Sequence, residues 1–296
     1  MKYNTIFRSF SDLIHQKVVK GTEINFLPIS FFKNFEIKTG VWETETIFTS
    51  SGTTKEGFSS HHIRSLDLYL QNTKEIFETH FGSPEDICFL CLLPSYLELQ
   101  GSSLIAMCKF LVDTSHDSRS AFYLNEYDRL ITTMQALSRE NKKTFLIGVT
   151  YALLDLLELN GFRAWDKLTI IKTGGMKGRR KEMSSDLVDS IMMKNLEIKT
   201  IKGEYGMTEC LSQLYSLGCN FYKFNSRMKI ILTELSDPFE QVQNGRPGRI
   251  NIVDLANVDS CGFISTDDIG IINEEGQISI LGRIDHSDLR GCNMLI

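Results

Sequence analysis

The segment that decides the fold runs from residue 144 to residue 175 and reads TFLIGVTYALLDLLELNGFRAWDKLTIIKTGG. Its two apolar, β-branched runs, at 144–149 and 168–173, predict buried strands. The stretch between them, at 151–160, has the spacing of apolar residues that is typical of a helix. A strand, a helix and a second strand in this order predict a parallel β-α-β unit.

The same alternation continues on both sides of this unit. Further strands are predicted at 45–50, 87–93 and 197–203. Further helices are predicted at 65–80, 124–140 and 181–194. This pattern indicates an α/β body that is built on layered, largely parallel sheets.

The pattern changes after about residue 227. Short strands are predicted there at 228–234, 248–253, 262–265, 270–273 and 277–281, separated by Gly, Asn and Asp turns. We therefore expect an α/β body at 1–226 and a β-rich subdomain at 227–296. The chain has no long linker, so the two parts are expected to pack as one unit.

Composition excludes several classes of protein. The chain has 296 residues, of which 42% are hydrophobic and 23% are charged, as in ordinary globular proteins. A net charge of −5 argues against a surface that binds duplex nucleic acid. The start of the chain does not resemble a signal peptide, and no apolar run is long enough to cross a bilayer. Seven scattered cysteines indicate free thiols, so a cytoplasmic protein without membrane insertion is expected.

A hydroxyl-rich loop at 49–57, TSSGTTKEG, is the sharpest local signal. It directly follows a predicted strand, and such a loop can offer hydroxyl and backbone N–H donors to phosphate oxygens. On composition alone, a polar turn is the more ordinary interpretation. Paired glycines at 174–175 also follow a strand, where a flat ring could approach because no Cβ intervenes.

Two more motifs carry groups that suit a nucleotide. Residues 203–209, GEYGMTE, are expected to end a strand and open a helix. Tyr205 could stack on a base, Thr208 could bind a phosphate, and Glu209 could hold Mg²⁺. Residues 265–270, STDDIG, and 282–285, GRID, could bind a ribose through a carboxylate and an Arg. Each of these motifs, taken singly, is also typical of a solvated turn.

The five motifs follow one another in an order that is typical of a known group of enzymes. From about residue 47 onward the chain resembles the adenylate-forming (ANL) superfamily. It is most similar to the acyl-protein synthetase (LuxE-type) branch, which is related to the phenylacetate-CoA ligases. Residues 93–104, 147–155 and 287–292 carry this closer likeness.

The resemblance implies ATP and Mg²⁺ as cofactors and assigns residues to the nucleotide. The ATP phosphates would be bound by the hydroxyl-rich loop, through Ser50, Ser51, Gly52, Thr53 and Thr54. The adenine would lie between the paired glycines, Gly174 and Gly175, and Tyr205.

The remaining assignments concern the reacting end of ATP and the ribose. Thr208 would contact the α-phosphate, Glu209 would bind the metal, and Asp268 would hold the ribose with help from Arg283. A carboxylic acid, expected to be a fatty acid, would then attack the α-phosphorus to give an acyl-adenylate and pyrophosphate. The protein would contribute positioning and charge neutralisation, since the nucleophile is already an anion.

Cys292 matches the near-terminal cysteine that accepts the acyl group as a thioester in the acyl-protein synthetase branch. The neighbouring Arg290 would favour the thiolate, which is the nucleophilic form. The resemblance also implies that the mobile C-terminal lid domain of ordinary acyl-CoA ligases is absent. Two departures from the superfamily pattern are Lys55, which directly follows Thr54 within the hydroxyl-rich loop, and Asp267, which replaces a glycine.

Three functions remain open from the sequence. The first is adenylation followed by transfer to Cys292, with a downstream acyl acceptor such as a reductase. The second is transfer to coenzyme A or to a carrier protein. The third is a non-catalytic module that binds a nucleotide or an acyl group. An oligomer is compatible with each of them. Cys88 and Cys91 have redox spacing but are expected to pack in the core, and His61 and His62 do not form a zinc motif.

Overall fold

The computed structural model describes residues 2–50, 57–94, 101–176, 179–181, 183–218 and 220–284. The predicted β-α-β unit is present. Strand β6 (Thr144–Val149), helix α6 (Thr150–Glu158) and strand β7 (Leu168–Thr173) follow one another, and the two strands pair in parallel. All residues of β6 are buried, which explains its unbroken apolar run.

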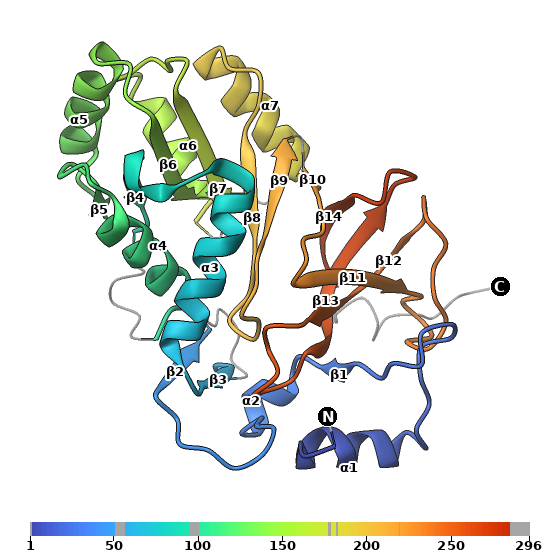
Figure 1. Ribbon diagram of the computed structural model, residues 1–296. Coiled ribbons are helices and arrows are strands. Elements are labelled where there is room, and N and C mark those ends of the chain that lie inside the picture. Colours follow the sequence, from blue (N-terminus) through green and yellow to red (C-terminus); the bar gives the residue numbers. More distant parts are fainter. Residues whose placement is uncertain are drawn as a thin grey trace.

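This unit belongs to a parallel sheet in the order β8-β7-β6-β4-β5. The additional strands are β4 (Cys88–Leu92), β5 (Ala121–Tyr123) and β8 (Lys202–Tyr205). The helices around it are α3 (Leu66–Phe81), α4 (Ser103–Thr114), α5 (Tyr127–Arg139) and α7 (Ser185–Leu196), seen in Figure 1. The direction of chain progression reverses between β4 and β6, and open α/β sheets bind ligands beyond the carboxyl ends of their strands at such a point.

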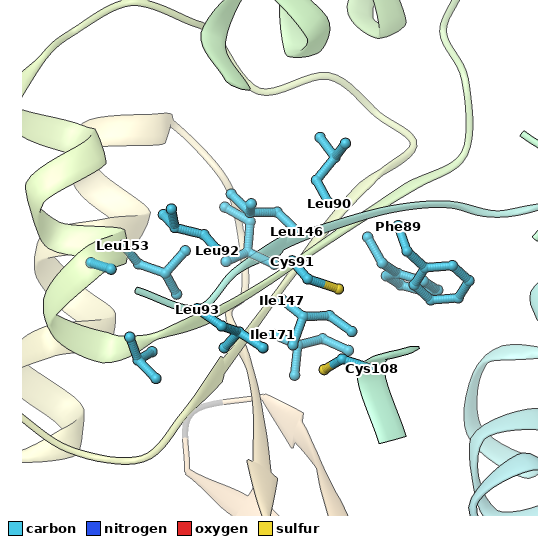
Figure 2. Packing of buried hydrophobic residues seen from close by; sticks show 14 of the residues in the cluster. Phe89, Leu90, Cys91, Leu92, Leu93, Cys108, Leu146, Ile147, Leu153 and Ile171 are labelled. Carbon is cyan, nitrogen blue, oxygen red and sulfur yellow. The ribbon is translucent and has the colours of Figure 1, made fainter. Parts of the chain in front are cut away.

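The body has one large hydrophobic core. Figure 2 shows side chains of β4, β6 and β7 packed against residues of α4 and α6. Cys88 and Cys91 are fully buried within β4, as is Cys108 in α4. The prediction that the first two serve core packing is therefore confirmed.

A second group of strands extends the same sheet beyond β8, in the order β11-β12-β13-β14-β10-β9-β8. Their bounds are β9 Leu214–Gly218, β10 Phe221–Tyr222, β11 Met228–Thr233, β12 Pro247–Asp254, β13 Phe263–Ile272 and β14 Ile278–Arg283. Figure 1 shows this β-rich part beside the α/β body. The described structure is therefore the α/β architecture that the sequence indicates.

The start of the chain packs on the β-rich part. Helix α1 (Thr5–Leu13), strand β1 (Leu27–Pro28) and helix α2 (Phe31–Asn34) precede a hairpin of β2 (Thr46–Thr49) and β3 (Ser60–Ile63). Strand β1 pairs with β13, and Phe7, Leu27 and Phe32 share a second hydrophobic core with Ile250 and Ile264. A 3₁₀ turn, Pro84–Asp86, leads into β4. None of the described helices is both long and apolar enough to span a membrane.

Three expectations about local structure are wrong. Strand β8 begins at residue 202 rather than 197, because Glu197 adopts the left-handed conformation that ends α7. The segments at 262–265 and 270–273 belong to one strand, β13, because Ile264, Thr266, Asp268 and Gly270 alternate on its buried face. No helix opens after Glu209, since the chain instead turns back into β9 beside β8.

Candidate active site

The paired glycines lie at the carboxyl end of β7. Both Gly174 and Gly175 are exposed, and Gly174 has a φ of +60°. Its carbonyl accepts a hydrogen bond from Thr150 Oγ1 at 2.7 Å, which fixes the loop to the start of α6. A Cβ added to Gly175 would meet no atom within 4 Å. This edge of the sheet therefore leaves room for a flat group against the backbone.

Tyr205, Asp268 and Arg283 form one cluster although they come from β8, β13 and β14. Tyr205 donates its hydroxyl to Asp268 Oδ2 at 2.8 Å, and Arg283 Nε donates to Asp268 Oδ1 at 3.1 Å. Burial raises the pKa of Tyr205, and the adjacent Asp268 carboxylate raises it further, so the phenol stays protonated and remains a donor. The sequence motifs that contain these residues are thus brought together in space.

Register explains why Asp268 faces this cluster. Asp268 lies opposite Arg283 in the antiparallel pair of β13 and β14. The backbone N–H of Asp268 donates to Thr266 Oγ1 at 3.0 Å, and 8% of the surface of Asp268 is exposed. A carboxylate has about four lone-pair sites, so after these two side-chain bonds it can still accept from both hydroxyls of a ribose.

Glu209 is a buried carboxylate near this cluster, with 5% of its surface exposed. Burial raises its pKa, while a hydrogen bond from the Ser59 hydroxyl and the charge of Arg283 lower it. The described residues contain no group of three His, Cys, Asp or Glu side chains arranged for a metal. One carboxylate together with substrate phosphates is nevertheless a common set of ligands for Mg²⁺, so Glu209 suits that ion.

Two side chains from other elements contact the backbone carbonyls of the turn that carries Thr208 and Glu209. His61 on β3 approaches the Thr208 carbonyl through Nδ1 at 2.8 Å. Asn257, which follows β12, donates Nδ2 to the Glu209 carbonyl at 2.7 Å. Sequence reasoning considered His61 only as a zinc ligand and did not consider Asn257.

Asp254, at the end of β12, holds the next part of the same turn. Its Oδ2 accepts from the backbone N–H groups of Leu211 and Ser212 at 2.8 and 3.0 Å. Its Oδ1 accepts from the Ser212 hydroxyl at 2.7 Å. The residue is 1% exposed, so this is an internal anchor, and no motif in the sequence pointed to it.

The β2–β3 hairpin brings the two ends of the hydroxyl-rich loop together. The Ser50 hydroxyl accepts from the Ser59 N–H at 2.9 Å, and the Ser50 N–H donates to the Ser59 carbonyl at 3.1 Å. Because the Ser59 hydroxyl also bonds to Glu209, Ser50 is connected to the candidate metal ligand. The other loop residues, Ser51, Gly52, Thr53 and Thr54, lie outside the described residues, as does Cys292.

Glu204 is a second carboxyl group that sequence reasoning missed. It accepts a hydrogen bond from Thr173 Oγ1 at 2.5 Å, at the end of the neighbouring strand β7. Burial raises the pKa of Glu204 to about 7. Its carboxyl also fills the space over Gly206, where an added Cβ would collide with Oε1. A large residue at position 206 would therefore displace this group.

Comparison with known proteins identifies a matching family. The chain matches the family model described as acyl-protein synthetase, LuxE, over residues 95–296. No curated protein matches the chain.

Several solved structures have the same fold. The ATP-bound MatB of Rhodopseudomonas palustris aligns with a TM-score of 0.59 and 16% identity, over 82% of this chain and 49% of MatB. The o-succinylbenzoate coenzyme A synthetase MenE of Bacillus subtilis, in complex with AMP, gives 0.57 and 18%, over 83% and 50%. The long-chain-fatty-acid-CoA ligase FadD1 of Archaeoglobus fulgidus gives 0.60 and 16%, over 85% and 53%.

This chain spans about half the length of these ligases. At such low identity the structural likeness establishes the fold, which is that of the N-terminal body of adenylate-forming enzymes. The family model covers more than half of the chain. The chain therefore belongs to the LuxE acyl-protein synthetase family.

Proposed function

We propose that the protein activates a carboxylic acid with ATP and passes the acyl group to a thiol. The observation that supports this most directly is the Tyr205–Asp268–Arg283 cluster with Glu209 beside it. It offers an acceptor for a ribose, a cation and a candidate metal ligand in one place. The family membership and the fold support the same activity.

In this proposal the nucleotide is held by residues from both parts of the chain. Gly174 and Gly175 leave open space for the adenine, Asp268 accepts from the ribose hydroxyls, and the Thr208 hydroxyl donates to the α-phosphate. Ser50 lies at the entrance of the loop that would contact the outer phosphates. Magnesium bound at Glu209 would neutralise phosphate charge as pyrophosphate leaves.

The reaction would proceed in two steps. A carboxylate oxygen of the acid attacks the α-phosphorus, the bond to the bridging oxygen breaks, and pyrophosphate leaves. A thiolate then attacks the acyl carbon, the bond from that carbon to the phosphate oxygen breaks, and AMP leaves. We propose Cys292 as the thiol, with a fatty acid as the substrate and a reductase, carrier protein or coenzyme A as the later acceptor.

The test of the first step is pyrophosphate exchange into ATP with a panel of carboxylic acids. We expect exchange that depends on both an acid and Mg²⁺, with the same rate in the presence and absence of coenzyme A. ATP binding without exchange for every acid in the panel would instead favour the non-catalytic binding module.

Replacing Cys292 with serine tests the second step. We expect normal pyrophosphate exchange, because the nucleotide site is unchanged, but no thioester on the protein. Intact-mass measurement after incubation with ATP, Mg²⁺ and the acid would reveal the acyl adduct, and hydroxylamine would release it from the wild-type chain. Replacing the buried Cys261 with serine serves as the matched control. An undiminished adduct on the Cys292→Ser chain would contradict the role of this thiol.

A further inference from the structure

The side chains that hold the Thr208–Glu209 turn come from two distant elements. His61 lies on the buried face of β3 and is 1% exposed. Its ring touches the Thr208 carbonyl through Nδ1 at 2.8 Å and Asn257 Oδ1 through Nε2 at 3.1 Å. The ring also packs against Phe32 in a T-shaped arrangement, with ring centroids 5.6 Å apart. The imidazole therefore has a fixed orientation.

The orientation of the Asn257 amide follows from its other contacts. Its Nδ2 donates to the Glu209 carbonyl at 2.7 Å and to the Cys261 carbonyl at 3.0 Å. Both partners are acceptors, so the amide nitrogen must face them and Oδ1 must face His61. His61 consequently lies between two acceptors. Burial lowers the pKa of His61 to about 4, so near neutral pH the ring is uncharged and has one N–H to donate.

Two consecutive carbonyls are fixed by this arrangement. His61 holds that of Thr208 and Asn257 holds that of Glu209. Fixing two adjacent carbonyls fixes the peptide planes on both sides of the Glu209 Cα, and with them the direction of its Cα–Cβ bond. Thr208 is held through the peptide plane that follows it, which contains its own Cα. The Glu209 carboxylate accepts a hydrogen bond from the hydroxyl of Ser59, which lies two residues before His61 on the same hairpin.

We propose that His61 and Asn257 are a positioning pair that sets the Thr208 hydroxyl and the Glu209 carboxylate for Mg²⁺ and the α-phosphate. The inference rests on the proposed function, because it assumes that these two side chains meet the metal and the nucleotide. In the pair, Nδ1–H of His61 donates to the Thr208 carbonyl, which is the shorter of the two contacts. His61 acts through the turn and does not itself touch the substrate.

Two substitutions distinguish the role of Nδ1 from that of Nε2 in the His61 ring. In His61→Asn the amide nitrogen can take the place of Nδ1, whereas in His61→Gln it can take the place of Nε2. We expect H61Q to lose Mg²⁺-dependent ATP affinity by roughly 10- to 100-fold, as is typical when a group behind a metal ligand is removed. H61N should restore most of that affinity. ATP binding without Mg²⁺ should be similar in all chains.

The matched control is His62→Gln on the same strand. His62 faces the opposite side of β3, where its Nδ1 contacts Thr44 Oγ1 at 3.1 Å. Calorimetric titration of each full-length chain with ATP, at several Mg²⁺ concentrations, gives the affinities. We expect H62Q to bind as the wild-type chain does. Equal Mg²⁺ dependence in H61Q and the wild-type chain would overturn the inference.

A measurement on the unaltered chain keeps the inference testable if a variant fails to fold. Long-range ¹⁵N–¹H spectra of the histidine-labelled protein report which ring nitrogen carries the proton. We expect the Nδ1–H form for His61, and an Nε2–H form would overturn the proposed donation to Thr208. If the wild-type chain binds Mg²⁺ and ATP but shows no pyrophosphate exchange, adenylation fails as a function. The binding series then still decides the role of His61.

Discussion

Replacing Asp268 with asparagine should abolish acid-dependent pyrophosphate exchange and weaken ATP binding by about 100-fold or more. Asp268 accepts from Tyr205 and from Arg283 through different oxygens. An asparagine keeps one acceptor oxygen and turns an NH₂ group toward one of these two donors. In the proposed complex Asp268 also accepts from both ribose hydroxyls, and hydrogen bonds to a charged group contribute about 1.5–3 kcal/mol each, so removing the charge from these two contacts accounts for that factor.

Asp267→Asn provides the matched control for this experiment. Asp267 is the preceding residue on β13, has a side chain 40% exposed, and lies 3.5 Å from Arg249 rather than in the cluster. The two substitutions change the net charge of the protein equally. We expect D267N to bind ATP as the wild-type chain does, in an equilibrium titration of both variants. If D268N also retained wild-type affinity, Asp268 would not hold the nucleotide.

The parts of the fold that the sequence predicts are those set by local pattern. The unbroken apolar runs of β6 and β7 and the helix between them carry a signal within about ten residues of each position. The β13 strand illustrates the opposite case. Its Asp-Asp-Ile-Gly stretch has the composition of a turn, yet β14 pairs with Asp268, Ile269 and Gly270, and this pairing keeps the strand extended across a register shift against β12. Pairing between distant strands therefore overrides local propensity there.

The residues of the candidate site also form two groups, those that belong to sequence motifs and those that only the fold brings together. Tyr205, Glu209 and Asp268 belong to recognisable motifs, and the structure brings them together through the continuous order β8-β9-β10-β14-β13. Their roles toward ATP remain predictions. His61 and Asn257 stand 196 residues apart, and nothing in their local sequence marks them as partners. Such supporting residues emerge only when the fold places a polar side chain against a particular carbonyl.

Replacing Glu204 with glutamine should stabilise the folded chain above pH 7 and flatten the dependence of its stability on pH. The folded-state pKa of Glu204 is raised from 4.5 to about 7 by burial. The folded state therefore binds this proton more tightly than the unfolded state does. Its favourable contribution is complete below the unfolded pKa, and it is lost as the pH rises through the folded pKa. The shift corresponds to a change of about 3 kcal/mol in the free energy of unfolding.

Within the described part of the chain, the groups whose pKa the Glu204 charge raises are neutral acids rather than cations. Those groups are the phenols of Tyr69, Tyr215 and Tyr222 and the thiol of Cys108. Glutamine retains an oxygen that can accept from the Thr173 hydroxyl, but it cannot ionise.

Urea unfolding of the wild-type and E204Q chains at pH 5 and pH 8 measures the effect of this charge. We expect the two chains to have similar free energies of unfolding at pH 5, and we expect E204Q to be more stable at pH 8. Glu274→Gln, in the exposed turn after β13, is the matched control, and its free energy of unfolding should change between the two pH values as that of the wild-type chain does. If the stability of E204Q also depended on pH as that of the wild-type chain does, the Glu204 carboxylate would be solvated in the folded chain.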